Sequence, residues 1–339
     1  MHSIFLITPK EDDTIRPVQS VYTQKITARL KQEAGLVTDV YINRDNIDRF
    51  LSAARGADAA FSTWSMPEFS KEEIAYYFPN LKAVFYSAGS VKSFALPFLE
   101  SGVRIFSAYA ANAVPVAQYT AAQIVLANKG FFLNCSPAGR VQYAAFAQQF
   151  SHCPGNYRAK VGLLGAGAIG RLVIKYLAPY DLDIFVYDPF LTEEAASSFG
   201  VKKASLDDIF ETCGVISNHL ADVPETKHLI NDDLLRRMRP YTTLINTGRG
   251  AQLDEAALAR RLAAEPTCCA LLDVTDPEPP EEESPLYRLP NVFITPHIAG
   301  SSGGELVRMA EYMLEEFHLF AAGKPVNYEI TKEMLATMA

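Results

Sequence analysis

Three polar side chains follow three successive predicted strands in the second half of the sequence. Arg249 lies in NTGRG, Glu278 in DVTDPEP and His297 in TPHIAG, each a few residues beyond an apolar run. Because the carboxyl ends of parallel strands share one crevice, these residues can converge there. They provide a group to anchor an anion, a proton donor and a carboxylate to orient that donor, which hydride transfer to a carbonyl requires.

Each of these three residues also has an ordinary structural interpretation when it is taken singly. Arg249 can be an exposed arginine, Glu278 one glutamate of an acidic loop, and His297 a loop histidine with satisfied hydrogen bonds. Their joint placement after successive strands favours the chemical interpretation.

A glycine-rich turn precedes them, in VGLLGAGAIG. Gly165 permits a tight bend, Gly167 lets the backbone approach a pyrophosphate, and Gly170 lets a helix pack close to a strand. Such a pattern alone also occurs in turns that only connect a strand to a helix. Here a predicted strand precedes it and a predicted helix follows it, so we expect a dinucleotide site.

Asp188 ends the next predicted strand, at about the twenty-residue distance from the turn that a ribose contact requires. A carboxylate accepts hydrogen bonds from ribose hydroxyls but repels a 2′-phosphate, and the residues that follow contain no arginine to bind one. NAD is therefore favoured over NADP. The alternative is a surface aspartate that starts a turn before Pro189.

Short β-rich runs alternate with helical patterns twice along the chain, which predicts two parallel sheets and an α/β fold. The first series of strands is predicted at 4–8, 38–42, 59–63, 81–86 and 103–107. The second is predicted at 161–164, 183–187, 215–218, 243–246, 270–274 and 292–295. The main helices are predicted at 21–34, 74–78 after a capping box of Ser70 and Glu73, 115–128, 168–177 and 304–321.

Composition limits the classes of partner. The chain has 339 residues, 49% of them hydrophobic, and a formal charge of −8. An acidic protein of this kind does not suit nucleic acid or an anionic membrane, and no apolar run approaches the length that spans a bilayer. The five cysteines form no CxxC pair and no zinc-like spacing, so we expect reduced thiols, no metal and a cytoplasmic protein.

With these motifs in order, the sequence closely resembles the D-isomer-specific 2-hydroxyacid dehydrogenases, a family that includes phosphoglycerate and D-lactate dehydrogenases and glyoxylate/hydroxypyruvate reductases. The resemblance covers nearly the whole chain. It depends on the GAGAIG turn, the YDP segment at 187–189, the HL pair at 219–220 with PET at 224–226, and the NTGRG, LDVTDPEP and PHIAG segments. Several ordered motifs with matching separations are far more specific than one glycine signature.

The resemblance implies a role for each matching residue. Arg249 would anchor the substrate carboxylate, His297 would be the acid/base, and Glu278 would pair with His297 so that it stays a usable acid near neutral pH; these are the candidate catalytic residues. The candidate cofactor-binding residues are Gly165, Gly167, Ala168, Ile169, Gly170, Asp188, His219, Leu220, Thr226, Thr247, Gly248, Arg249, Asp273, His297 and Ala299, with Thr247 and Asp273 lining the nicotinamide pocket. The candidate substrate-binding residues are Ala88, Gly89, Ser90, Arg249 and His297.

The resemblance also implies a discontinuous arrangement of two domains. A Rossmann NAD-binding domain, residues 110–301, would be inserted into a flavodoxin-like substrate domain made of residues 1–109 and 302–339, both with parallel sheets. The helix that joins them would start near Asn112. Relatives of this kind are usually homodimers, so a homodimer is expected.

The segment 87–93, SAGSVKS, departs from the glycine-rich turn ending near an aspartate that is usual in the family. Backbone N–H groups of Ala88, Gly89 and Ser90 can still bind a carboxylate. Lys92 either adds charge for a second anionic group or is a solvated lysine at a helix start. Trp64 either lines the substrate pocket or packs under a loop. Met309, Met313 and Phe317 have the spacing of buried helix positions.

The sequence therefore predicts NAD-dependent interconversion of a small 2-oxo acid and its D-2-hydroxy acid. Two alternatives remain open. One is an oxidoreductase of the same fold acting on formate or phosphite. The other is an NADH-sensing binding protein similar to the transcriptional corepressors that share this fold.

Overall fold

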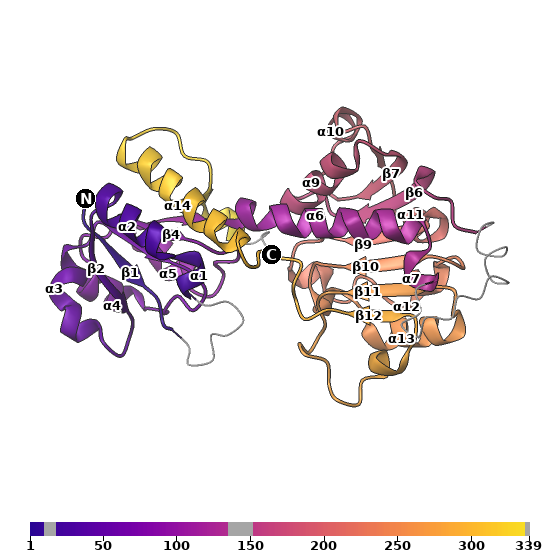
Figure 1. Ribbon diagram of the computed structural model, residues 1–339, viewed down its shortest axis with the longest axis horizontal. Helices are drawn as coiled ribbons and strands as arrows, with labels where there is room; N and C mark the ends of the chain where they lie inside the picture. The colour runs from indigo at the N-terminus through magenta and orange to yellow at the C-terminus, as the bar shows by residue number, and fades with distance from the viewer. Residues whose placement is uncertain (10–17, 135–151, 336–339) are drawn as a thin grey trace. The chain divides into compact units, whose positions relative to one another are not determined.

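A computed structural model describes residues 1–9, 18–134 and 152–335. Contacts within the chain divide it into two compact units (Figure 1). The first unit comprises Met1–Asn112 and Ser301–Met338, and the second comprises Ala113–Gly300. Among the helices of the described residues, none combines the length and the apolar character needed to cross a membrane.

The first unit is built on a six-stranded sheet in the order β13-β5-β4-β3-β1-β2. Its first five strands along the chain are parallel and have the flavodoxin-like order, while β13 pairs antiparallel with β5. The strands are β1 Ser3–Leu6, β2 Leu36–Ile42, β3 Ala59–Ser62, β4 Ala83–Tyr86, β5 Arg104–Ser107 and β13 Glu329–Ile330.

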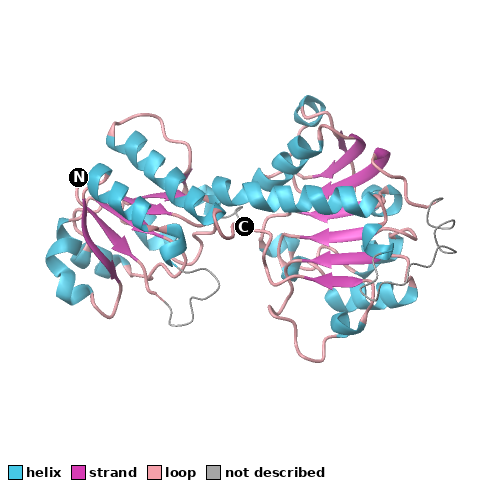
Figure 2. Cartoon of the chain, viewed as in Figure 1, coloured by secondary structure: helices cyan, strands magenta, loops and turns pink. Residues whose placement is uncertain are grey.

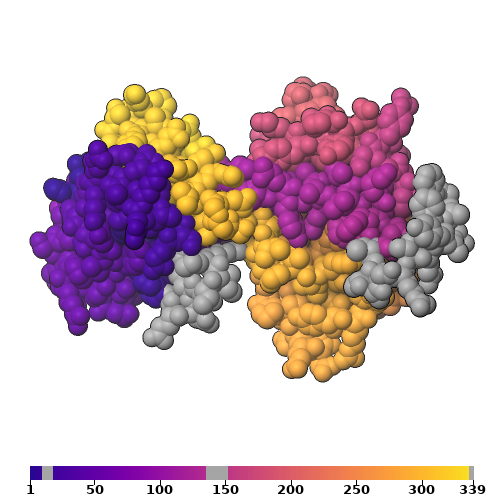
Figure 3. Space-filling model, viewed as in Figure 1, coloured from indigo at the N-terminus to yellow at the C-terminus, as the bar shows by residue number. Residues whose placement is uncertain are grey.

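Helices cover both faces of this sheet. They are α1 Val18–Val21, α2 Gln24–Glu33, the 3-10 turn η1 Ile47–Phe50, α3 Leu51–Gly56, α4 Lys71–Tyr77, α5 Ala95–Glu100, α14 Glu305–Ala321 and α15 Lys332–Leu335. Helix α14, in yellow at the surface of this unit in Figure 3, contacts β4 and β5. Its Met309, Met313 and Phe317 are buried, which confirms the prediction that they are core residues. The last long helix thus completes the unit that the N-terminal strands begin.

The second unit is built on a parallel seven-stranded sheet in the order β12-β11-β10-β9-β6-β7-β8, the order of a Rossmann fold with one strand added at the edge. Its strands are β6 Tyr157–Leu164, β7 Asp181–Tyr187, β8 Lys202–Lys203, β9 Val215–Asn218, β10 Thr243–Asn246, β11 Cys269–Leu272 and β12 Val292–Ile294. Strands β9 and β10 are buried at every position, as expected for strands covered on both faces.

Figure 2 shows helices in front of and behind this sheet. They are α6 Tyr109–Asn128, α7 Phe131–Asn134, α9 Ala168–Leu177, α10 Glu193–Ser198, α11 Leu206–Thr212, α12 Asp232–Arg237 and α13 Glu255–Ala264, with 3-10 turns η2 Pro224–Thr226, η3 Gly250–Gln252 and η4 Pro285–Arg288. One face buries Ala117, Ile124 and Val173, and the other buries Ile209, Leu234 and Leu258.

The prediction of an α/β protein with two largely parallel sheets is confirmed. The predicted bounds of β9, β10 and α9 match the structure, and Ser70 and Glu73 form the expected capping box. Three details were wrong. Helix α6 begins at Tyr109, upstream of Asn112, and continues through Pro115. The run predicted as one helix at 21–34 contains the last residue of α1 and, after a break, α2. The two-residue strands β8 and β13 were missed.

Candidate active site

Two glycines of the turn after β6 are required by backbone packing. Gly165 has a φ of +100°, and a Cβ atom there would lie 2.6 Å from the carbonyl oxygen of His219. A Cβ atom at Gly170 would lie 2.1 Å from the carbonyl oxygen of Gly165. These distances are far below van der Waals contact, so a side chain at either position would displace the backbone.

Gly167 differs from both of its neighbours. It is the N-cap of α9, it has an ordinary φ of −71°, and a Cβ atom added to it would meet nothing within 4 Å. Packing within the described chain therefore does not explain a glycine here. The open space adjoins the N-terminus of a ten-residue helix, where N–H groups and the helix dipole favour an anion. This turn fits the pyrophosphate of a dinucleotide.

Asp188 follows β7 and contacts the glycine turn. One of its carboxylate oxygens accepts a hydrogen bond from the backbone N–H of Ala166 at 2.7 Å, and the other accepts from the N–H of Phe190 at 2.8 Å. These bonds fix the carboxylate beside the turn. Each oxygen has further acceptor capacity, so the position remains compatible with ribose hydroxyls.

His297 and Glu278 form a hydrogen-bonded pair. The Nδ1 atom of His297 lies 2.7 Å from Oε1 of Glu278, and the side chains are 38% and 42% exposed. The pairing uses Nδ1 of the imidazole ring, which the Glu278 carboxylate thereby orients. His297 also has a φ of +53°, which is uncommon for a residue other than glycine and occurs preferentially at functional positions.

Buried Asp273 holds the loop that carries His297. Its carboxylate accepts from the hydroxyl of Thr295 at 2.6 Å and from the backbone N–H groups of Ile298 and Ala299, both at 2.9 Å. Its carbonyl oxygen accepts from the N–H of His297 at 3.0 Å. These contacts fix the left-handed backbone of His297, and the expected place of Asp273 in the nicotinamide pocket stays a prediction.

Arg249 lies in the loop between β10 and α13. Its Nη1 donates to the carbonyl of Gly248 at 2.9 Å, and its Nε lies 3.9 Å from a carboxylate oxygen of Asp222. The next residue, Gly250, packs against the loop that leads to Glu278: a Cβ atom there would lie 2.0 Å from the carbonyl carbon of Thr275. The arginine loop and the glutamate loop are therefore in direct contact.

A buried amide network, which the sequence analysis missed, supports the Arg249 loop. The Nδ2 of Asn218 donates to Oδ1 of Asn246 at 3.0 Å and to Oε1 of Gln252 at 2.7 Å. Asn246 Oδ1 accepts from the N–H of Gly248, and Gln252 Oε1 accepts from the N–H of Arg249. Both strands end in Asn, and these buried amides were the signal that could have revealed the network.

His219 is buried, with 8% of its surface exposed, and both of its ring nitrogens are within hydrogen-bond distance of a hydroxyl. Its Nε2 lies 3.0 Å from the hydroxyl of Ser217 and its Nδ1 lies 3.4 Å from the hydroxyl of Thr247, which in turn contacts Thr120 at 3.2 Å. Burial lowers the pKa of His219 to about 3, so this imidazole is neutral at physiological pH. It does not resemble a proton donor. It lies beneath the glycine turn, where its own carbonyl touches Gly165.

Leu220 and Thr226 shape the loop that follows β9. Leu220 is buried, and the hydroxyl of Thr226 donates to the carbonyl of Ala221 at 2.7 Å. Thr226 thus closes the loop that carries Asp222.

The predicted substrate turn lies in the first unit, after β4. The hydroxyl of buried Ser107 donates to the carbonyls of Ala88 at 3.0 Å and Gly89 at 2.6 Å. Among the described residues, no oxygen accepts from the backbone N–H of Ala88, Gly89 or Ser90. The turn is therefore held by its carbonyls.

Two neighbouring side chains had open interpretations. Trp64 packs against the apolar clusters on both faces of the first sheet, which supports the packing interpretation. Lys92 is exposed in the turn that precedes α5, and both interpretations of it stay predictions.

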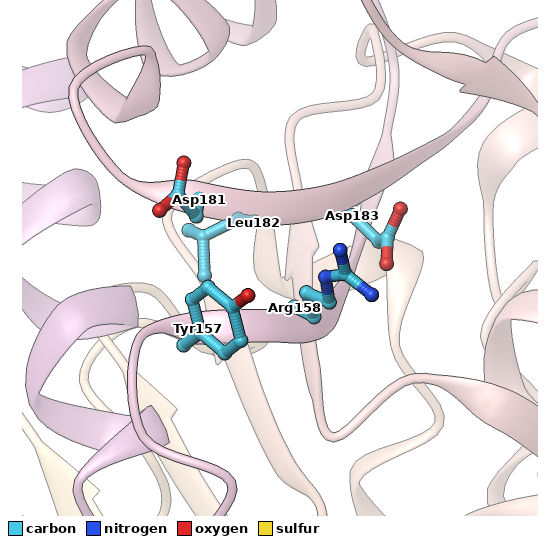
Figure 4. A pocket seen from close by; sticks show the side chains of 5 residues that line it. All are labelled: Tyr157, Arg158, Asp181, Leu182 and Asp183. Carbon is cyan, nitrogen blue, oxygen red and sulfur yellow. The ribbon is translucent and has the colours of Figure 1, made fainter.

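A separate hollow of about 450 Å³ lies where β6 and β7 begin (Figure 4). It is lined by Tyr157, Arg158, Asp181, Leu182 and Asp183, and the guanidinium of Arg158 lies toward Asp183. The glycine turn and the His297 pair lie at the opposite, carboxyl ends of the strands. This hollow is therefore distinct from the candidate site.

No group of histidine, cysteine and acidic side chains in the described ranges is arranged to hold a metal ion. Cys153, Cys213, Cys268 and Cys269 are free thiols, and burial raises the pKa of Cys213 to about 11 and of Cys269 to about 12. These two thiols are thus protonated and unreactive at neutral pH. Cys135 lies outside the described residues.

Comparisons with known proteins agree with this geometry. Residues 138–299 match the family model described as "D-isomer specific 2-hydroxyacid dehydrogenase, NAD binding domain". D-3-phosphoglycerate dehydrogenase of Archaeoglobus fulgidus is 34% identical over 166 residues, which are 49% of this chain and 32% of that protein. Glyoxylate reductase of Korarchaeum cryptofilum is 33% identical over 180 residues, 52% of this chain and 54% of that protein. The matches thus span about a third and about half of these relatives.

The fold is also similar to that of solved structures. D-mandelate dehydrogenase of Rhodotorula graminis aligns with a TM-score of 0.75 at 18% identity, over 98% of this chain and 97% of that one. At this identity the likeness shows the fold alone. The family match covers residues 138–299, so this part of the chain, which lies in the second unit, is similar to the NAD-binding domain of the D-isomer-specific 2-hydroxyacid dehydrogenases. The predicted resemblance to this family is confirmed over these residues, and the same match confirms the predicted cofactor, NAD.

Proposed function

We propose that the chain is an NAD(H)-dependent dehydrogenase that interconverts a small 2-oxo acid and its D-2-hydroxy acid. The observation that carries this proposal is the 2.7 Å pair of His297 and Glu278 at the carboxyl edge of an NAD-binding sheet, with the Arg249 loop packed against the Glu278 loop. This arrangement provides one proton carrier and one anion anchor beside a cofactor turn.

In this proposal Arg249 binds the carboxylate of the acid through its planar guanidinium, which matches two carboxylate oxygens. Bound NADH supplies the hydride that reduces C2. His297 delivers a proton from Nε2 to the C2 oxygen, and Glu278 orients the ring through Nδ1 and stabilises the imidazolium by its charge. Oxidation reverses these roles, so that neutral His297 accepts the hydroxyl proton.

The glycine turn would hold the pyrophosphate at Gly167 and the N–H groups that begin α9, and Asp188 would bind the adenosine ribose. The remaining candidate contacts carry over from the family resemblance: Ala168, Ile169, His219, Leu220, Thr226, Thr247, Gly248, Asp273 and Ala299. The contacts observed for His219 and Asp273 support positioning roles for these two residues.

We further propose that the turn at Ala88, Gly89 and Ser90 binds an anionic group of the substrate through its backbone N–H groups. A homodimer in the cytoplasm completes the proposal, and light scattering at twice the chain mass would support the dimer.

The test is NADH consumption, followed at 340 nm, with glyoxylate, hydroxypyruvate, pyruvate and branched 2-oxo acids. We expect turnover of at least one acid by the wild-type chain and a loss of it in Arg249→Gln. NADH binding without turnover of any acid would contradict the proposal. Reduction of NAD by formate or phosphite would then favour the first alternative, and an NADH-dependent protein partner the second.

A further inference from the structure

Asp222 places a negative charge beside the proposed substrate anchor. One of its carboxylate oxygens lies 3.9 Å from Nε of Arg249, and the two side chains are 46% and 36% exposed. An ion pair of this length and exposure adds little to stability. The ion pair matters because a negatively charged substrate bound to Arg249 would be repelled by the Asp222 carboxylate.

The loop that carries Asp222 is fixed to the Arg249 loop by Gln252. The Nε2 of Gln252 donates to the carbonyls of Leu220 at 3.1 Å and Ala221 at 2.8 Å. Its Oε1 accepts from the N–H of Arg249 at 3.2 Å. A single buried side chain therefore ties the backbone on both sides of the ion pair. The backbone that carries Asp222 is therefore held beside the Arg249 loop, which keeps the Asp222 carboxylate near the guanidinium.

A substrate carboxylate bound to the guanidinium lies within hydrogen-bond distance of it. It therefore lies within about 10 Å of the Asp222 carboxylate, which is close to one Debye length at physiological salt. Repulsion between the two grows with each negative charge that the substrate carries. The free energy of binding lost to this repulsion is smallest for a monoanion and larger for an acid with a second carboxylate or a phosphate.

We propose that Asp222 is a charge filter that makes the site select monoanionic 2-oxo acids over dianionic and phosphorylated ones. This inference rests on the proposed function, because it takes Arg249 as the anchor of the substrate carboxylate. It names the substrate class as a 2-oxo acid whose side chain carries no further negative charge.

Initial rates of wild type and Asp222→Asn with pyruvate and glyoxylate, compared with oxaloacetate and 2-oxoglutarate, test the filter. We expect KM to fall about threefold for the monoanions and about tenfold for the dianions, because the lost repulsion acts on each charge. The kcat should stay within twofold. At 0.5 M NaCl the difference between the two acid classes should shrink through screening.

Asp207→Asn is the matched control. Asp207 pairs with Arg237 at 3.5 Å on the surface of the same unit, with exposures of 59% and 40%, so the variant removes an equal charge from a comparable pair. Its ratio of kcat/KM between dianions and monoanions should equal that of wild type. An unchanged ratio in Asp222→Asn, or a higher KM for all acids, would overturn the filter, since Asp222 would then only orient Arg249.

A binding experiment separates this inference from the proposed function. The unreactive acids oxamate, a monoanion, and oxalate, a dianion, are titrated into the NADH complex with NADH fluorescence as the signal. If Asp222→Asn binds oxalate more tightly relative to oxamate than wild type does, and wild type turns over no acid, the result supports the filter and refutes the dehydrogenase. Turnover without any change in this preference refutes the filter alone, and binding of neither anion refutes the filter as well.

Discussion

The two parallel sheets differ at their carboxyl edges. In the first unit the buried side chains there are hydroxyls, Ser62, Thr63, Ser87 and Ser107, each fully buried. They bond mainly to carbonyls, as in the contact from Thr63 to Ser87 at 3.0 Å. In the second unit the same edge carries Arg249, Glu278 and His297. One α/β architecture thus serves as a neutral, hydrogen-bonded platform in one unit and as an ionisable site in the other.

This difference indicates where the chemistry is concentrated. Loops after parallel strands have the same position in both sheets, so topology alone does not distinguish them. The side chains on those loops do: hydroxyls hold backbone in place, whereas an arginine can bind an anion and a histidine–carboxylate pair can transfer a proton. Four predictions test how sharply this division holds.

The largest effect is expected from His297→Asn. Asparagine tolerates a left-handed backbone, so the fold should be kept while the proton carrier is lost. We expect kcat for a 2-oxo acid to fall about a thousandfold. The Kd for NADH should change less than twofold, as measured by fluorescence titration. A kcat near that of wild type would show that His297 is not the proton carrier. The kcat of Glu278→Gln should lie between those of wild type and His297→Asn.

The two glycines of one turn should respond in opposite ways. In Gly170→Ala the new methyl meets a backbone oxygen at 2.1 Å, so the free energy of unfolding should fall by about 3 kcal/mol. In Gly167→Ala it meets open space, so stability should stay within about 0.5 kcal/mol while the Kd for NADH rises at least about tenfold. Urea unfolding measures the free energy of unfolding of both variants, and NADH titration measures their Kd for NADH. Equal losses of stability would show that Gly167 is also a packing glycine.

Acid should destabilise the chain through His219. Its pKa is about 3 in the folded state and near 6.5 when unfolded, so the unfolded chain binds the proton more readily between these values. Stability from this group is full above pH 6.5 and falls with pH by up to about 1.4 kcal/mol per unit, or about 2 kcal/mol from pH 6.5 to pH 5. Urea unfolding should show this slope in wild type and its loss in His219→Gln. If the free energy of unfolding falls with pH equally in both proteins, groups other than His219 cause the fall.

The smallest effect is expected from Ser107→Ala in the first unit. The variant removes the hydroxyl that bonds the carbonyls of Ala88 and Gly89. We expect stability to fall by about 1 kcal/mol and KM for the 2-oxo acid to rise a few-fold, with kcat unchanged. Steady-state kinetics distinguish this from His297→Asn. A large fall in kcat would contradict the view of this edge as a neutral platform.

Local patterns predicted much of the fold. The bounds of β9 and β10 followed from short apolar runs, and the capping box at Ser70 and Glu73 from residue type and spacing. Strand β8 was missed because Lys202 and Lys203 are exposed at an edge and show no apolar pattern, and β13 because its two residues are too few to form a pattern. Helix α6 was cut short because Pro115 suggested a start, although the helix runs through it.

The candidate site was predicted as a set of residues and not as a set of contacts. Placement after strands identified Arg249, Glu278 and His297, since strand order alone indicates the shared edge. The bond from Asn218 to Gln252 joins residues 34 positions apart, and the pair of Asp222 with Arg249 has no local signature either. Such pairings depend on the sheet order and register, which single-sequence patterns do not contain.

The missing side chain at Gly250 has a consequence for protein engineering. The backbone of Thr275 occupies the space that a Cβ atom at position 250 would need. Residues 247–252 and 273–279 therefore have complementary shapes and pack directly against each other. Transplanting only one of these loops from a related enzyme would disturb the contact between the loop of Arg249, the proposed anchor, and the loop of Glu278, the proposed partner of His297. A change of specificity in this scaffold should therefore exchange both loops as one block.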